Sequence, residues 1–259
     1  MTLHLVQTEL HWEDPAANTS HMEHYLKRIN DGVVVLPEMF STGFSMASEA
    51  LAETMQGPTL EWMTNTAQEQ QLTLCGSVII EDGGSFFNRF LWVTPDGSVS
   101  TYDKRHLFRM ASEHEHFSPG TANITVQDGA IRIRPQVCYD LRFPAWSRNK
   151  WSHNKKEVSY DLLLFVANWP AARRNQWLAL LRARAIENLC YVVGVNRIGI
   201  DGNQVAYSGD SVVFGPEGEE LFNLGSEDTV VSFTPDLDRL ASYREQFPAH
   251  LDADSFEIR

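Results

Sequence analysis

Cysteine is scarce in this chain, and its distribution bounds the cellular setting. The 259 residues include three cysteines, Cys75, Cys138 and Cys190, an odd number at wide spacings. A disulfide-stabilised secreted domain would have an even set of closely spaced cysteines, so this pattern favours reduced thiols in a cytosol. The N-terminal residues also lack a basic segment followed by an apolar stretch. We therefore expect a cytoplasmic protein without a secretory signal.

Positive charge and long apolar runs are scarce as well. Lysine and arginine number 21 against 34 aspartates and glutamates, which gives a net charge of −13 and no basic run. Such a chain is poorly suited to bind phosphates, so neither nucleic acid nor an anionic membrane is expected as a partner. No run approaches the ~18 consecutive apolar residues of a membrane-spanning helix. A cytosolic, acidic, globular protein fits these absences.

What the chain does have is an alternation of short apolar runs and helical patterns. Runs 32–38 and 161–168 predict buried strands, whereas 15–30 and 175–189 place apolar residues at helical spacing. Without a linker or a repeat, the pattern predicts one domain over residues 1–259. We expect an α/β fold in which two packed sheets carry helices on their outer faces. Further strands are predicted at 3–7, 72–81, 86–95, 129–138, 190–199, 204–216 and 228–235, and a further helix at 58–71.

Three side chains that could take part in catalysis lie at or just after the ends of strand-like runs. Glu38 ends VVVLPE, Cys138 ends IRPQVC, and Lys104 follows a strand pair that turns at Pro95-Asp96-Gly97. A carboxylate directly after buried apolar residues is costly to desolvate without a partner. A cysteine nucleophile needs a base or a nearby positive charge, which Glu38 and Lys104 could supply. Taken alone, Cys138 remains open to three interpretations: a packing residue, a metal ligand or a nucleophile.

Four motifs together carry a resemblance to a known family. They are VVVLPEMFSTGF, YDKRHLF, SEHEHFSPG and VCYDLRFP. In order and spacing they are similar to the nitrilase, or carbon–nitrogen hydrolase, superfamily, and within it to the ω-amidase branch. The resemblance implies a four-layer αββα sandwich that pairs two protomers into an eight-layer homodimer. It extends over nearly the whole chain, including RARAIEN and SGDSVVFGPEGE.

The resemblance also implies roles for particular residues. Cys138 matches the nucleophile, Glu38 the general base and Lys104 the catalytic lysine. Glu113 matches a second glutamate that positions the lysine and the substrate, although Glu115 could take its place in a shifted alignment. The backbone N–H of Tyr139, with Lys104, is expected to form the oxyanion hole. Cys75 and Cys190 have no charged neighbours in sequence and are expected to be packing residues.

Two arginines that open a loop raise the question of substrate binding. Arg173 and Arg174 follow the strand-like run 161–168. The ω-amidase resemblance implies a substrate with a distal carboxylate, which suits the planar fork of an arginine, and Arg173 is our candidate. Asp140 and Arg142, beside the nucleophile, are expected to form a local ion pair or hydrogen-bonded turn that fixes its geometry.

No metal or other cofactor is expected. The segment HEH, with His114 and His116 near His106, suggests zinc at first sight. However, histidines at i and i+2 share no helix face, and no third ligand has a typical spacing.

The resemblance implies an amidohydrolase that releases ammonia from the terminal amide of small α-keto acid amides, 2-oxoglutaramate and 2-oxosuccinamate. Alternatives within the superfamily are a nitrilase, a carbamoylase or another amidase. A binding protein without catalysis on the same fold would be expected to have lost part of the Glu38, Lys104 and Cys138 set, and the set is intact.

Overall fold

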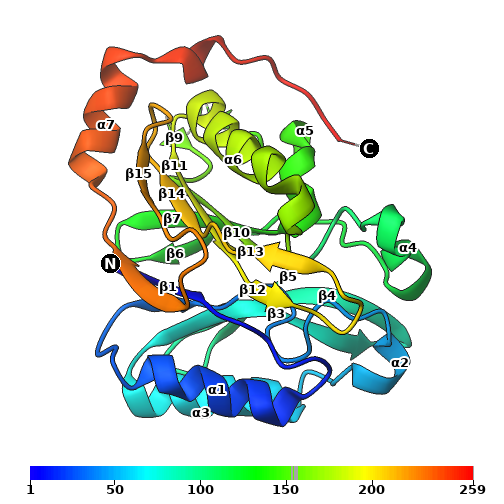
Figure 1. The fold of residues 1–259 in the computed structure, drawn as a ribbon. Coiled ribbons are helices and arrows are strands. Elements are labelled where there is room, and N and C mark those ends of the chain that lie inside the picture. Colours follow the sequence, from blue (N-terminus) through cyan, green and yellow to red (C-terminus); the bar gives the residue numbers. More distant parts are fainter. Residues whose placement is uncertain (153, 155–156, 259) are drawn as a thin grey trace.

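Two six-stranded sheets form the centre of the computed structural model, which describes residues 1–152, 154 and 157–258 (Figure 1). The first sheet combines both ends of the chain, because its edge strand β16 pairs antiparallel with β1. In spatial order its strands are β16 (Thr229–Phe233), β1 (Leu3–Gln7), β2 (Val33–Val35), β3 (Thr73–Asp82), β4 (Ser85–Val93) and β5 (Val99–Asp103).

The second sheet is built from the middle of the chain. Its central strands β7, β10 and β11 are parallel, so they end at the same edge of the sheet. In spatial order its strands are β15 (Glu220–Asn223), β14 (Val212–Phe214), β11 (Tyr191–Asn196), β10 (Leu162–Ala167), β7 (Ile131–Val137) and β6 (Val126–Asp128). Two short ribbons accompany the sheets: β8 (Trp151–Ser152) with β9 (Glu157–Val158), and β12 (Ile198–Ile200) with β13 (Ala206–Ser208).

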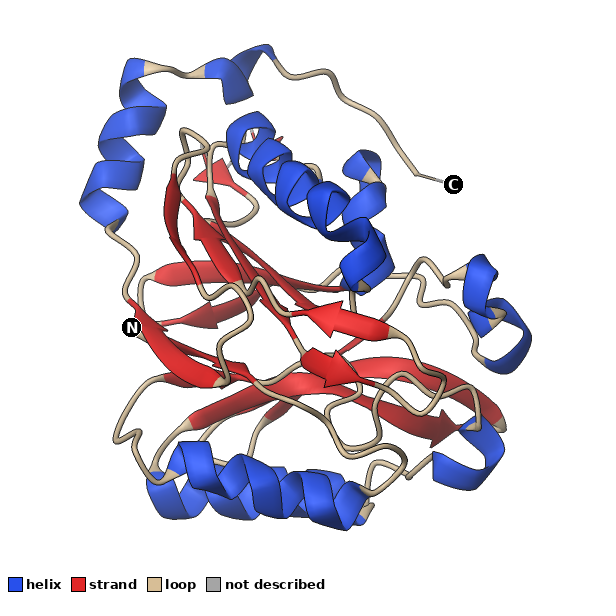
Figure 2. Cartoon of the chain, in the orientation of Figure 1, coloured by secondary structure: helices blue, strands red, loops and turns tan. Residues whose placement is uncertain are grey.

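Helices cover the outer face of each sheet. Figure 2 shows α1 (Pro15–Leu26) and α3 (Pro58–Gln70) below the first sheet and α6 (Arg174–Asn188) above the second. The four layers are therefore helix, sheet, sheet and helix, and the predicted αββα sandwich is confirmed. The remaining helices are short or peripheral: α2 (Ser48–Leu51), α4 (Glu113–His116), α5 (Pro144–Ser147) and α7 (Leu237–Gln246).

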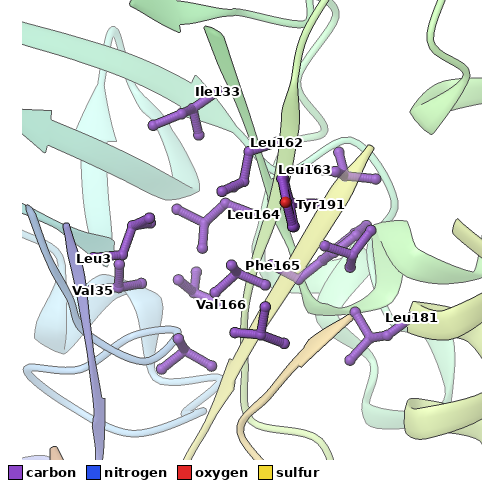
Figure 3. Packing of buried hydrophobic residues seen from close by; sticks show 14 of the residues in the cluster. Leu3, Val35, Ile133, Leu162, Leu163, Leu164, Phe165, Val166, Leu181 and Tyr191 are labelled. Carbon is purple, nitrogen blue, oxygen red and sulfur yellow. The ribbon is translucent and has the colours of Figure 1, made fainter. Parts of the chain in front are cut away.

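The main core lies between the two sheets. Leu3 and Val35 of the first sheet face Leu164 and Val166 of the second, all fully buried (Figure 3). The neighbouring Val34 points the other way, into a second cluster between the first sheet and the helices α1 and α3. Both faces of β2 are covered, which explains why every residue of this strand is apolar. Each such side chain contributes about 1.5–3 kcal/mol of transfer free energy.

The structure corrects some expected boundaries. Helix α1 begins at Pro15, where Asp14 accepts a hydrogen bond from the backbone N–H of Ala17, but it ends at Leu26 rather than at residue 30. Strand β2 ends at Val35, so Glu38 lies beyond the sheet rather than in it. Strand β15 and helix α7 were not expected. Of the residues of helix α7, only Leu240 is buried.

No helix among the described residues is both long enough and apolar enough to cross a membrane.

Candidate active site

Cys138 stands where β7 ends and a single 3-10 turn, η2 (Cys138–Arg142), begins. Its φ of 44° is a left-handed conformation that non-glycine residues seldom adopt and that surrounding structure must hold in place. The sulfur lies 4.0 Å from the carbonyl oxygen of Asn168, the residue directly after β10. Because β7 and β10 are parallel neighbours, their ends bring these two residues together.

Asp140 holds the turn in this conformation. Its Oδ2 accepts hydrogen bonds from the backbone N–H of Val137 at 3.1 Å and from the Tyr102 hydroxyl at 2.7 Å. Its Oδ1 accepts from the backbone N–H of His106 and lies 2.7 Å from His106 Nδ1. The predicted hydrogen-bonded turn is therefore present. The alternative ion pair with Arg142 is wrong, because that guanidinium lies over the Trp169 ring instead.

Glu38 reaches the same place from the first sheet. Its side chain is fully buried, and its Oε1 accepts hydrogen bonds at 2.8 Å from both Lys104 Nζ and Asn88 Nδ2. Its Oε2 accepts from the backbone N–H of Asn168 at 2.7 Å, and its carbonyl oxygen accepts from Asn168 Nδ2. These bonds fasten the ends of the two sheets to each other around Cys138.

Lys104, directly after β5, is fully buried between two carboxylates. Besides Glu38, its Nζ donates to both oxygens of Glu113 at 2.9 Å. Glu113 Oε2 also accepts from the backbone N–H of Phe108. The neighbouring Glu115 is exposed and lies 3.8 Å from His114. The structure thus brings Glu113, and not Glu115, to the lysine.

The pKa shifts of these groups follow from burial and from their mutual charges. Burial, with the Glu38 charge, raises the pKa of the Cys138 thiol well above its usual range, against a smaller opposing effect of Lys104. Burial works against the lysine charge, but Glu113 and Glu38 outweigh it and raise the pKa of Lys104. Burial, reinforced by Glu38 and opposed by Lys104, raises the pKa of Glu113. At neutral pH the lysine is therefore charged and the thiol is protonated, so attack by sulfur requires a proton acceptor.

Two asparagines in the cluster escaped the sequence analysis. Asn88 lies in β4, and its Nδ2 donates to Glu38 Oε1 and, at 3.3 Å, to Glu113 Oε1. Asn168 is 3% exposed and its Oδ1 has no hydrogen-bond partner among the described residues. The only signal for Asn88 is a lone amide within the apolar run FFNRFLWV, which by itself names no function.

A cavity of about 730 Å³ opens onto Cys138 and Asn168. Six of its lining residues are aromatic. Tyr139 lines it, with its ring centroid 5.0 Å from that of Phe108. The aromatic side chains of the wall are Trp12, Phe44, Phe108, Tyr139, Trp169 and Tyr207. A concave, largely apolar cavity with a few polar groups is typical of a small-molecule site.

The two candidate arginines of the loop, Arg173 and Arg174, have different surroundings in the structure. Arg173 lines the cavity, with its guanidinium 5.5 Å from the centroid of the Phe108 ring. Arg174 pairs with the buried Asp210 at 2.7 Å and does not line the cavity.

The remaining cysteines and histidines lie apart from this chemistry. Cys75 and Cys190 are free and buried in the core, and burial raises the pKa of Cys190 to about 12. His106 is held by Asp140 and stacks on Phe143. Among the described residues, no three histidine, cysteine, aspartate or glutamate side chains are grouped so as to hold a metal ion.

Comparison with known proteins supplies independent evidence. Residues 2–245 match the family described as carbon-nitrogen hydrolase. The chain is 47% identical to the omega-amidase YafV of Escherichia coli K12 over 98% of this chain and 97% of the relative. It is 29% identical to the 2-oxoglutaramate amidase of Bacillus subtilis, over 95% of each chain.

Among solved structures, a CN-hydrolase superfamily protein of Xanthomonas campestris superimposes with a TM-score of 0.97 at 44% identity, covering 100% of this chain and 99% of that one. That protein was solved with an arsenic adduct in its active site.

Proposed function

Because the chain belongs to the carbon–nitrogen hydrolase family, we propose that it hydrolyses the terminal amide of the small α-keto acids 2-oxoglutaramate and 2-oxosuccinamate. The observation that carries the proposal is the buried set of Glu38, Lys104, Glu113 and Cys138, in which Cys138 lines the cavity. The names of the relatives, omega-amidase and 2-oxoglutaramate amidase, support the choice of substrate.

The first half of the reaction forms an acyl-enzyme. The Cys138 sulfur attacks the amide carbon, and its proton passes to Glu38 as the carbon–sulfur bond forms. Negative charge develops on the former carbonyl oxygen, where Lys104 and the backbone N–H of Tyr139 stabilise it. The intermediate then expels nitrogen, which takes the proton from Glu38 and leaves as ammonia. A thioester between Cys138 and the keto acid remains.

The second half releases the acid. A water molecule attacks the thioester carbon while Glu38 accepts a proton from it. The carbon–sulfur bond breaks, the proton returns to sulfur, and the dicarboxylic keto acid departs. Glu113 keeps Lys104 charged and in place throughout, because it holds the ammonium through both carboxylate oxygens. Arg173, on the cavity wall, is proposed to attract the substrate's carboxylate.

The cellular setting and the assembly are further parts of the proposal. A cytoplasmic location is supported by the three free, buried cysteines, which need no oxidising compartment. A homodimer would have twice the 29.4 kDa mass of the chain, and light scattering coupled to size-exclusion chromatography measures this.

The function is tested by ammonia release from a panel of substrates. We expect rapid release from 2-oxoglutaramate and 2-oxosuccinamate, and slow release from glutamine, nitriles and N-carbamoyl amino acids. Cys138→Ala should abolish release from every member of the panel. A Cys138→Ala protein with normal ammonia release would exclude the mechanism. A wild-type protein that prefers nitriles or carbamoyl compounds would keep the mechanism and exclude the substrate.

A further inference from the structure

Arg142 lines the same cavity as Cys138. The two residues are the first and last of the same 3-10 turn, and both line the 730 Å³ cavity. Asp140 lies between them in the turn and accepts a hydrogen bond from the backbone N–H of Val137. Sequence analysis gave Arg142 a local structural role, and the structure leaves it without the expected partner.

The surface on which Arg142 rests is rigid. Its guanidinium lies 5.1 Å from the centroid of the Trp169 ring. Trp169 is 3% exposed, and its backbone N–H and carbonyl oxygen both bond the side chain of Asn196. Its indole N–H donates to the carbonyl oxygen of Arg173. A stacked guanidinium keeps its edge free, and that edge carries the N–H groups that bind a carboxylate in two parallel hydrogen bonds.

The charge of Arg142 is not neutralised within the protein. No described carboxylate pairs with Arg142 or with Arg173, whereas the neighbouring Arg174 is neutralised by Asp210. Two acids, Glu13 and Asp201, do line the cavity, but neither forms an ion pair with an arginine in the part of the chain that the structure describes. Glu13 accepts the Ser45 hydroxyl.

The second acid, Asp201, is bonded still more completely. Its Oδ1 accepts the backbone N–H groups of Asn203 and Val205, and its Oδ2 accepts the Tyr207 hydroxyl. The cavity thus holds two unpaired cations in a protein whose net charge is −13. Both guanidinium groups are part-buried on the wall of this cavity, where they are free to bind the anionic group of a ligand.

We propose that Arg142 is the residue that binds the carboxylate of the substrate, with Arg173 as the second cation of the same subsite. The two guanidinium groups would also disfavour an amino acid amide such as glutamine, because its α-ammonium would lie beside them. This inference rests on the proposed function for the identity of the substrate. It adds a determinant of specificity that selects α-keto acid amides by their charge.

The test compares Arg142→Met and Arg142→Lys with wild type on 2-oxoglutaramate. Loss of a charge-assisted bidentate contact corresponds to about 2–3 kcal/mol, so Arg142→Met should lower kcat/KM by about 30- to 150-fold, mainly by raising KM. Arg142→Lys retains the charge but not the fork and should lose less. The matched control is Arg109→Met, which removes an exposed arginine outside the cavity and should stay within twofold of wild type.

A second measurement separates binding from folding and from chemistry. Titration of 2-oxoglutarate, the product, into folded protein should give a Kd at least 30-fold weaker for Arg142→Met than for wild type. Equal affinities, or equal kcat/KM values for wild type and Arg142→Met on 2-oxoglutaramate, would overturn the role of Arg142 alone. A wild-type protein that fails to hydrolyse 2-oxoglutaramate would instead reject the proposed function.

Discussion

At the scale of single residues, the site is a chain of buried charges in which each group depends on its neighbours. Lys104 is flanked by Glu38 and Glu113, and all three have no exposed surface. Removing one charge from such a group leaves another uncompensated, and this is expensive in a buried site. Asn88 is the neutral group whose Nδ2 donates to both carboxylates.

Asn88 therefore acts as a positioning residue for the base. Asn88→Ala should lower kcat at least tenfold with a smaller change in KM, because the carboxylates lose a shared donor. Asn88→Asp should be worse, since it adds a third negative charge. Asn175→Ala, at an exposed asparagine of α6, is the control for both variants. Steady-state kinetics with 2-oxoglutaramate measures the effect, and unchanged kcat in Asn88→Ala would reject the positioning role.

The sequence located Glu38, Lys104, Glu113 and Cys138, and the structure brings all four together. These residues could be predicted because an apolar run that gives way to polar residues marks the end of a strand, and because their motifs resemble a family. Asn88 and Asn168 could not be found in this way. An asparagine within a strand is ambiguous, because periodicity does not reveal which face of a two-sheet sandwich meets the site.

At the scale of elements, the contact between α6 and the second sheet depends on a close approach at Gly194. A Cβ atom there would lie 2.6 Å from Leu181 Cδ1 and 2.7 Å from Trp177 Cζ2, both on α6. The Trp177 ring is fixed by a hydrogen bond from its indole N–H to the carbonyl oxygen of Asp210. Because residue 194 of β11 is a glycine, helix α6 can pack closely against the sheet at this position.

Gly194→Ala should consequently destabilise the protein by about 1–3 kcal/mol through overpacking. Urea unfolding followed by tryptophan fluorescence measures the loss. The double variant Gly194→Ala/Leu181→Ala is the informative partner, because removing the Leu181 side chain makes room for the new methyl group. Losses that simply add in the double variant would show that the two residues do not compete for space.

Helix α7 shows why some elements escape a sequence analysis. It is attached by polar contacts, in which Arg244 donates to Asp161 and to the carbonyl oxygens of Leu189 and Tyr160. Strands β2, β7 and β10 were predictable because hydrophobic burial leaves a pattern in the sequence. Polar contacts such as those of Arg244 leave no pattern in the sequence, because the sequence does not distinguish an arginine that anchors a helix from one that is exposed to solvent.

The same contacts make a prediction about acid stability. Burial alone would raise the pKa of Asp161, but hydrogen bonds from Arg132 and Arg244 outweigh it and hold the pKa below its usual value. A carboxyl with a depressed folded-state pKa stabilises the protein fully above about pH 4, the unfolded-state pKa. That contribution is lost as the pH falls through the folded-state value. Wild type should therefore lose more unfolding free energy than Asp161→Asn between pH 6 and pH 3, as measured by urea titration. Equal losses would contradict the assignment.

At the scale of the whole molecule, catalysis depends on the meeting of two sheets. Glu38 and Lys104 follow strands of the first sheet, whereas Cys138 and Asn168 follow strands of the second. The apolar core between the sheets sets the distance between these groups. Family resemblance predicted the αββα layers, but the wall of the cavity comes from loops and from the ribbon β12–β13. Its residues, Asp201 and Tyr207 among them, carry no pattern that could have placed them there.

The most direct test is the intact mass of the protein quenched during turnover of 2-oxoglutaramate. We predict a population heavier by one 2-oxoglutaryl group, attached to Cys138 and absent from Cys138→Ala. Ammonia release at the full rate without any such adduct, or with the adduct on another residue, would contradict the account.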